Sequence, residues 1–273
     1  MTAFFHHFMY DFRTGLRDKT LLMMNYLFPL GFYILMGLLM TGLNPTFAPT
    51  MTPAMIIVAV MACTLLGLPG PLVEARDAGV FRSFKINGVP AFSIVMIPVL
   101  SSLLHMILVS AIITASAGPI FKAGVPVNWG YFVLILLLTI FTMASAGILI
   151  GVISPNSRAI VLFSQVIFLP SMILGGLMIP SSMLPPTLYR IALLLPSTHA
   201  MNAWRGLAFG MPADFAPIWS VLALLSSGLI AFGLANYLFS WDSKNPRRGH
   251  SPFLALLALL PFVLTAIFIS PGI

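Results

Sequence analysis

The side chains that could carry acid–base or metal chemistry are few in this chain, and they are scattered. His6 and His7 are neighbours, so on a helix they face different directions and do not favour a shared metal ion. His105 lies inside an apolar run, and His199 lies close to Arg205 in a stretch broken by prolines. An ionisable residue within a membrane segment is a functional candidate, but we prefer a neutral His105 that hydrogen-bonds two helices together.

The motifs of common catalytic and nucleotide-binding sites are absent from the sequence. It contains no Gly-x-x-x-x-Gly-Lys-Ser/Thr phosphate loop, no His-Glu-x-x-His and no Gly-x-Ser-x-Gly. The single cysteine, Cys63, lies in an apolar run and excludes a disulfide framework. We therefore expect neither an enzyme nor a metal or cofactor held by this chain itself.

The composition predicts an all-α bundle of membrane-spanning helices in one domain, residues 1–273. Hydrophobic residues make up 59% of the chain and charged residues only 7%, whereas soluble domains have roughly 25% charged residues. Strands of a membrane barrel would alternate apolar and polar residues, and these runs do not. The net charge of +7 is explained by basic residues at the cytoplasmic face of a membrane, without nucleic acid as a partner.

Apolar runs of about 20 residues are long enough to cross the hydrocarbon, and they predict a six-span core over 21–240. Pro29 is expected to bend the first span, and Gly-Leu-Pro-Gly-Pro to end the second. Asn156 or Ser157 is expected to cap the fifth. The run 253–270 predicts an extra C-terminal span. The six predicted core spans are 21–42, 53–73, 91–117, 130–152, one that begins at 160 and contains the polar Gln165, and 217–240.

The first residues, 2–18, predict an amphipathic helix at the membrane interface. Large apolar residues recur there at three- and four-residue spacing, which places them on one face. Arg13, Arg17 and Lys19 follow at the far end, where anionic headgroups would attract them. A secretory signal peptide has the opposite order, with charge first.

The segment 74–90 concentrates charge between the second and third predicted spans. Two aromatic residues three positions apart would share a face of a short helix, which suggests docking to a protein partner. The alternative is a solvated loop that lies on the headgroups, and from charge alone this alternative is favoured. The residues that carry the docking hypothesis are Glu74, Arg76, Asp77, Gly79, Phe81, Arg82, Phe84 and Lys85.

The stretch 160–210 begins as a span and is then broken repeatedly by proline. The run 188–195 is too short to cross a membrane, and Trp204 with Arg205 predicts a water interface. Irregular backbone at membrane depth is tolerated where protein or a water-filled cavity covers it. We therefore expect short helices that dip back into the outer leaflet, with a long loop anchored by apolar residues as the alternative.

Both segments resemble ABC exporter permeases of the type-2 class, the membrane subunits of drug, lipid and polysaccharide exporters. The segment 74–90 resembles the family's coupling segment, although Phe81 and Arg82 stand where an acidic residue is usual. The later stretch resembles the family's outer gate, which implies a short helix over 186–195. The matching gate residues are Gly175, Gly176, Pro180, Pro196, Thr198, His199, Arg205 and Gly206.

The resemblance implies a membrane transport subunit that works with partners. Separate ATP-binding cassette subunits would hold the ATP and Mg²⁺, and a second permease copy would complete a homodimer or heterodimer in the lipid bilayer. Six spans with both ends in the cytoplasm are usual in the family, so the run 253–270 is a departure.

The basic residues predict the orientation in the cell (inner) membrane. With the N-terminus inside, ten of the 13 Lys and Arg residues lie in cytoplasmic segments and three, Lys122, Arg190 and Arg205, lie outside. This places 74–90 in the cytoplasm and 175–212 outside, and the extra span would place Ile273 outside.

We expect a permease that moves an apolar or amphipathic substrate, such as a drug, lipid or lipid-linked glycan, out of the cytoplasm or inner leaflet. Two alternatives remain open. One is an intramembrane lipid-modifying enzyme that uses His105, His199 and Arg205. The other is a secondary carrier, or a scaffold that transports nothing.

Overall fold

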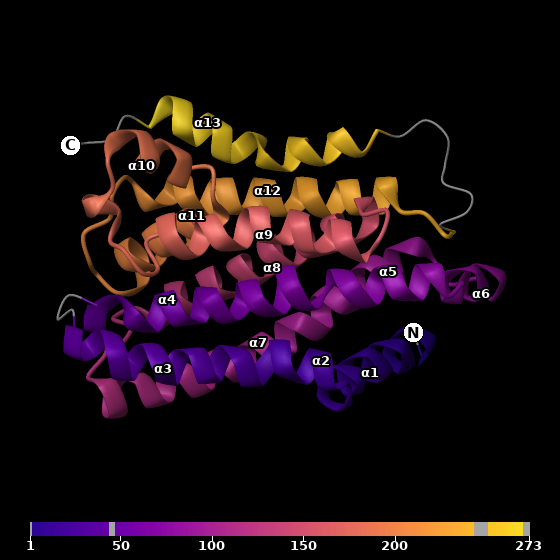
Figure 1. The fold of residues 1–273 in the computed structure, drawn as a ribbon, viewed down its shortest axis with the longest axis horizontal. Coiled ribbons are helices and arrows are strands. Elements are labelled where there is room, and N and C mark those ends of the chain that lie inside the picture. Colours follow the sequence, from indigo (N-terminus) through magenta and orange to yellow (C-terminus); the bar gives the residue numbers. More distant parts are fainter. Residues whose placement is uncertain (1, 44–46, 243–250, 270–273) are drawn as a thin grey trace.

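The computed structural model describes residues 2–43, 47–242 and 251–269, and within these ranges every regular element is a helix. Six helices among the described residues are long and apolar enough to cross a membrane, as predicted. They lie roughly side by side (Figure 1), so the bundle has two ends. We call one the α6 end, which holds α1 (Thr2–Arg17), α5 (Pro69–Asp77) and α6 (Val80–Ile86). The other is the α10 end, which holds α10 (Pro186–Ala192) and α11 (Pro196–Ala203).

The first span is one continuous path built from three elements: α2 (Lys19–Leu22), the π-helical turn η1 (Met23–Leu27) and α3 (Phe28–Leu43). Asp18 caps it by accepting hydrogen bonds from the backbone of Thr20 and Leu21, both at 2.9 Å. The wide turn precedes Pro29, whose missing N–H and bulky ring disturb the helix there.

The second span runs through α4 (Phe47–Met61), the π-helical turn η2 (Ala62–Gly67) and α5 (Pro69–Asp77). The prediction that it ends at 73 was wrong, because Pro69 occupies the first turn of α5, where proline is tolerated. It also begins at Phe47 rather than 53. Nearly every residue of α4 is buried, so this helix is the centre of the bundle.

The next three spans are α7 (Ala91–Phe121), α8 (Trp129–Ile153) and α9 (Ser157–Leu174). Asn156 caps α9 as expected, since its side chain accepts a hydrogen bond from the backbone of Ala159 at 3.0 Å. Asn128 caps α8 in the same way, through the backbone of Tyr131 at 3.1 Å.

Short elements then fill the α10 end before the sixth span. They are η3 (Ser181–Met183), α10 (Pro186–Ala192), α11 (Pro196–Ala203) and the π-helical turn η4 (Trp204–Ala208), followed by α12 (Pro217–Leu238). The helix expected over 186–195 ends at Ala192, because Pro196 starts a separate helix four residues later.

The C-terminal apolar run forms a 3₁₀ segment, η5 (Pro252–Leu259), and then α13 (Leu260–Phe268). It runs beside α12 along the bundle (Figure 1). The run has 17 residues, fewer than the six long helices. A 3₁₀ segment rises about 2 Å per residue, so 8 such residues and 9 α-helical ones still extend about 30 Å, near the hydrocarbon thickness.

The N-terminal helix α1 (Thr2–Arg17) packs against α7 at the α6 end. Its apolar face is divided: Phe5 and Leu16 are exposed, whereas the ring of Phe12 stacks on His105 with centroids 4.5 Å apart. Gly15 makes this contact possible, because a Cβ there would lie 2.4 Å from Nε2 of His105. The predicted interfacial helix is thus also docked on the bundle.

Candidate functional site

The charged segment at the α6 end is two helices joined by a tight turn. Gly79 has a φ of +75°, the left-handed conformation that favours glycine, and it connects α5 to α6 (Val80–Ile86). Gly88, with a φ of +73°, follows α6 before Pro90. Figure 1 shows α6 at the extreme end of the bundle, beyond the neighbouring helices.

Arg76 does not face a partner as the docking hypothesis required. Its guanidinium is buried and donates hydrogen bonds to the carbonyl oxygens of Val152 at 3.3 Å and Ser154 at 2.7 Å. The last carbonyls of a helix lack partners within the helix, so Arg76 satisfies the end of α8. Its role is to fasten α5 to α8.

The two aromatic residues of α6 also face inward, so the expectation that both are exposed was wrong. Phe81 is 4% exposed, and its ring lies 5.4 Å from that of Phe239 and 6.5 Å from that of Phe84. Phe84 is half-buried against His7 of α1, at 5.1 Å between centroids. A helix this short needs an apolar face against the bundle, and these two rings supply it.

The outward face of this segment is charged, and its most exposed apolar residue lies at the tip of α6. Ile86 is 82% exposed, and Glu74, Asp77 and Lys85 of the same two helices are exposed as well. Arg82 is exposed as well and pairs with Asp242, which follows α12. This face, rather than the aromatic pair, is what α6 offers to a partner.

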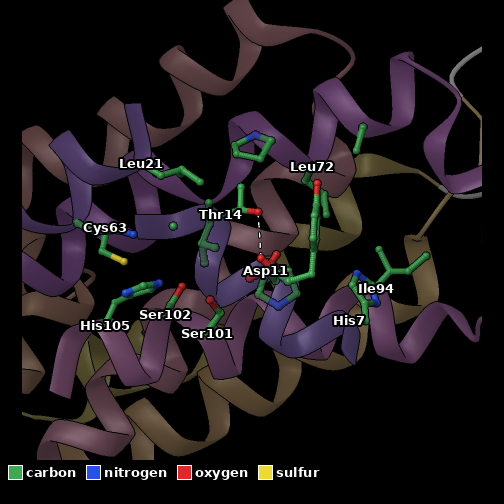
Figure 2. Close-up of a pocket in the computed structure, with 18 of the residues that line it drawn as sticks. His7, Asp11, Thr14, Leu21, Cys63, Leu72, Ile94, Ser101, Ser102 and His105 are labelled. Carbon is green, nitrogen blue, oxygen red and sulfur yellow. Dashed lines mark hydrogen bonds between the residues drawn. The ribbon is translucent and has the colours of Figure 1, made fainter. Parts of the chain in front are cut away.

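Behind α6 lie two adjoining cavities, of about 300 Å³ and about 660 Å³. The first is lined by α1, the first two spans, α6 and α7. Figure 2 shows Asp11, Ser101, Ser102 and His105 among its lining residues. His7, Tyr10, Val80 and Phe84 line both cavities.

His105 joins two spans by a hydrogen bond, as the sequence analysis expected. Its Nδ1 lies 2.6 Å from the hydroxyl of Tyr26 in η1, which is a hydrogen bond between the third span and the first. Gln165 on α9 is half-buried, and its Oε1 has no hydrogen-bond partner among the described residues.

The glycines and prolines predicted for the outer gate shape the turns of the α10 end. Gly176 has a φ of +75°, and a Cβ on Gly175 would lie 2.4 Å from Oγ of Ser197. Pro180 precedes η3 and Pro196 begins α11. Gly206 lies against Pro217, which a Cβ there would approach to 2.3 Å.

Arg205 is held in a polar cluster. Its guanidinium donates to the Asp214 carboxylate at 3.0 Å and to Ser181 Oγ at 3.4 Å, and Ser181 donates to the same carboxylate. The backbone N–H of Asp214 donates to Asn202 of α11 at 2.8 Å. The cluster ties η3, α11 and the loop before α12 together.

Trp204 and His199 are buried, contrary to the water interface expected at Trp204. The Trp204 indole N–H donates to the carbonyl of Phe132 in α8 at 3.3 Å. His199 Nε2 donates to the carbonyl of Leu193 at 2.8 Å and lies 3.2 Å from Thr265 Oγ1 of α13. His105 lies near the α6 end, so the three residues of the enzyme alternative do not form one site.

Comparison with known families decides how these features are understood. The model of the ABC-2 type transporter family matches residues 2–209, from α1 through η4. The chain belongs to the ABC-2 type transporter family. Both segments that carried the resemblance fall inside the match, apart from residue 210, whereas α12 and α13 lie beyond it.

The curated relatives of this ABC-2 chain are distant. It is 26% identical over 183 residues to "Inner membrane transport permease YhhJ" of Escherichia coli (strain K12), and equally to the protein of that name in Shigella flexneri. The match covers 65% of this chain and 47% of each relative, so the chain spans about half of their length. No solved structure matches. The family and the six apolar helices make this a multi-pass membrane transport subunit.

Several residues that organise this ABC-2 chain were missed from the sequence. Asp214 was not linked to Arg205, because the irregular chain between them has no period that would place the two side chains together. Tyr26 was not linked to His105, because the two lie 79 positions apart. Asp11 offered a signal: it is the one acidic residue in the interior of the helix predicted over 2–18, whose last residue is Asp18.

Proposed function

We propose that this chain is the permease subunit of an ATP-driven exporter, and that a separate ATP-binding cassette subunit docks on the outward face of α5 and α6. The chain would move an apolar or amphipathic substrate, such as a drug, a lipid or a lipid-linked glycan, from the cytoplasm or inner leaflet. ATP and Mg²⁺ would be held by the partner, and a second permease copy would complete the pathway.

The observation that carries the proposal is the construction of the α6 end. Only Leu68 separates η2 from α5 within the second span, and only Ala78 and Gly79 separate α5 from α6. A push on α6 therefore reaches α4, the buried centre of the bundle, through one nearly continuous helix. Arg76 hydrogen-bonds α5 to the end of α8, so the second span and α8 would move together.

The charge pattern supports a cytoplasmic position for this end. Arg13, Arg17 and Lys19 lie there with Arg82 and Lys85, as expected for the positive side of a membrane protein. The α10 end would then face outside, with Arg205 and Asp214 holding the short helices closed over the pathway.

The test is a charge placed on the tip of α6. An apolar residue central to an interface typically contributes on the order of 2 kcal/mol, so Ile86→Asp should reduce co-purification with the ATP-binding subunit more than tenfold. Val127→Asp is the matched control, since Val127 is 77% exposed and lies between α7 and α8 at the α10 end. If Ile86→Asp keeps the subunit and its transport activity, α6 is not the docking element.

A further inference from the structure

The cavities between α1 and α6 hold an acidic group that faces no Lys or Arg among the described lining residues. Asp11 is the one acidic residue, and Lys and Arg are absent, among the described residues that line the two cavities. The three carboxylates in ion pairs within the described ranges are Asp77, Asp214 and Asp242. Ser101 lines the same cavity as Asp11, but its hydroxyl carries no charge that would neutralise the carboxylate.

The surroundings of Asp11 favour a positively charged ligand. Burial raises the pKa of Asp11, which means that the site makes the bare carboxylate costly. Burial also lowers the pKa of the neighbouring His7, so this histidine is a poor source of compensating charge. A cation placed beside Asp11 would restore the favourable interaction that burial removes.

The remaining walls favour an apolar body on that cation. Leu68, Leu72 and Pro98 line the first cavity together with the rings of Phe81 and Phe84. Aromatic faces attract organic cations. A volume of about 300 Å³ is within the usual range for small-molecule sites, and the second cavity extends it. A phospholipid headgroup fits poorly, because its phosphate would find neither Lys nor Arg among the described lining residues.

We propose that the paired cavities bind an organic monocation with an apolar body, with Asp11 as its counter-ion. The bound molecule would touch α1, α6 and α7 at once, because His7, Phe84 and Ser101 all line the space. The docked helix α1 would form one wall, held to α7 by the contact between Gly15 and His105. Resting on the proposed function, this names a substrate class for the exporter and places its ligand directly behind the docking helix.

The experiment measures binding of tetraphenylphosphonium to the purified full chain in an uncharged detergent by equilibrium dialysis. No ATP-binding subunit is needed, so binding is measured separately from transport. Asp11→Asn keeps the shape and removes the charge, and its affinity should be at least about tenfold weaker, since a partly buried charge pair is strong at close range. Asp18→Asn is the matched control, because Asp18 is an exposed acid directly after α1 and asparagine can still cap α2, and this variant should bind within about twofold of the parent.

A second measurement on the unaltered chain uses tetraphenylborate, which has the same four rings and the opposite charge. The proposal expects it not to displace tetraphenylphosphonium. Equal binding by Asp11→Asn, or displacement by the borate, would overturn the site. Binding that depends on Asp11, without any ATP-driven transport, would support the site and refute the proposed function. ATP-driven transport without such binding would support the proposed function and refute the site.

Discussion

Arg76 illustrates at the scale of one residue how a charged side chain can serve structure. It lies in a segment whose other charges are exposed, yet its guanidinium is buried on the carbonyls of Val152 and Ser154. A buried guanidinium with two carbonyl acceptors is expensive to remove, because the acceptors then lose their partners.

Arg76→Ala should therefore destabilise the protein by about 2–4 kcal/mol, the cost of leaving two buried carbonyls unpaired. Arg82→Ala removes a charge on the same segment, but its pair with Asp242 is exposed on the arginine side and should contribute less than about 1 kcal/mol. Thermal unfolding of both variants in the same detergent measures the difference. Equal melting temperatures would show that the Arg76 contacts contribute nothing.

Residue types in the sequence predicted the segment's helical tendency and its charge, but not the direction of its side chains. Phe81 and Phe84 were expected to face a partner because aromatics are favoured at interfaces, and the structure turns them inward. The choice depended on Phe239, more than 150 residues later, whose ring covers Phe81. A short helix at the end of a bundle buries the face that packs against a distant element. The sequence of the helix alone does not show which element that is.

At the scale of elements, close backbone approach fixes how the spans pack. Gly147 and Gly151 lie four residues apart on α8 and face the second span. A Cβ on Gly147 would lie 2.0 Å from the carbonyl oxygen of Thr64, and one on Gly151 would lie 2.8 Å from Leu72. Small residues at this spacing let membrane helices approach closely, where packing rather than the hydrophobic effect holds them.

Gly147→Ala should push α8 away from η2 and destabilise the fold by about 1–3 kcal/mol, the usual cost of overpacking. Gly233→Ala on α12 is the matched control, because a Cβ there meets nothing within 4 Å. The yield of monodisperse protein and its melting temperature measure the effect. If the two variants behave alike, the close contact between α8 and η2 does not hold the bundle.

Span existence and order were predictable, because runs of about 20 apolar residues have few other uses. The residues at which the spans end near prolines could not be predicted. The second span passes Pro53, Pro69 and Pro71, since Pro69 and Pro71 lie at the start of α5 and a π-helical turn precedes them. Local sequence marks a proline as a disturbance, and the packing around α4 decides whether the helix continues.

At the scale of the whole molecule, the two ends differ in construction. The α6 end has exposed basic residues and the protruding α6, and the α10 end has short helices joined by the Arg205 cluster. The C-terminal run reaches the α10 end, because Thr265 of α13 meets His199 of α11 there. Lys244, Arg247 and Arg248, which contributed to the predicted orientation, lie outside the described residues.

Single cysteines should show which end faces the cytoplasm. Ile86→Cys should react with an impermeant thiol reagent only from the inside, and Met183→Cys and Val127→Cys only from the outside. All three native side chains are well exposed, and the native Cys63 is buried and should give little background. Labelling of Ile86→Cys and Met183→Cys from the same side would refute the proposed orientation.

A transport assay that identifies the source of energy tests the central claim most directly. The purified chain and its ATP-binding cassette partner should be reconstituted in vesicles and loaded with a tetraphenylphosphonium-type substrate. The account predicts export that requires hydrolysable ATP, that stops with Ile86→Asp and that continues when proton and sodium gradients are collapsed. Export that continues without ATP and follows an ion gradient would contradict it, and would make the chain a secondary carrier.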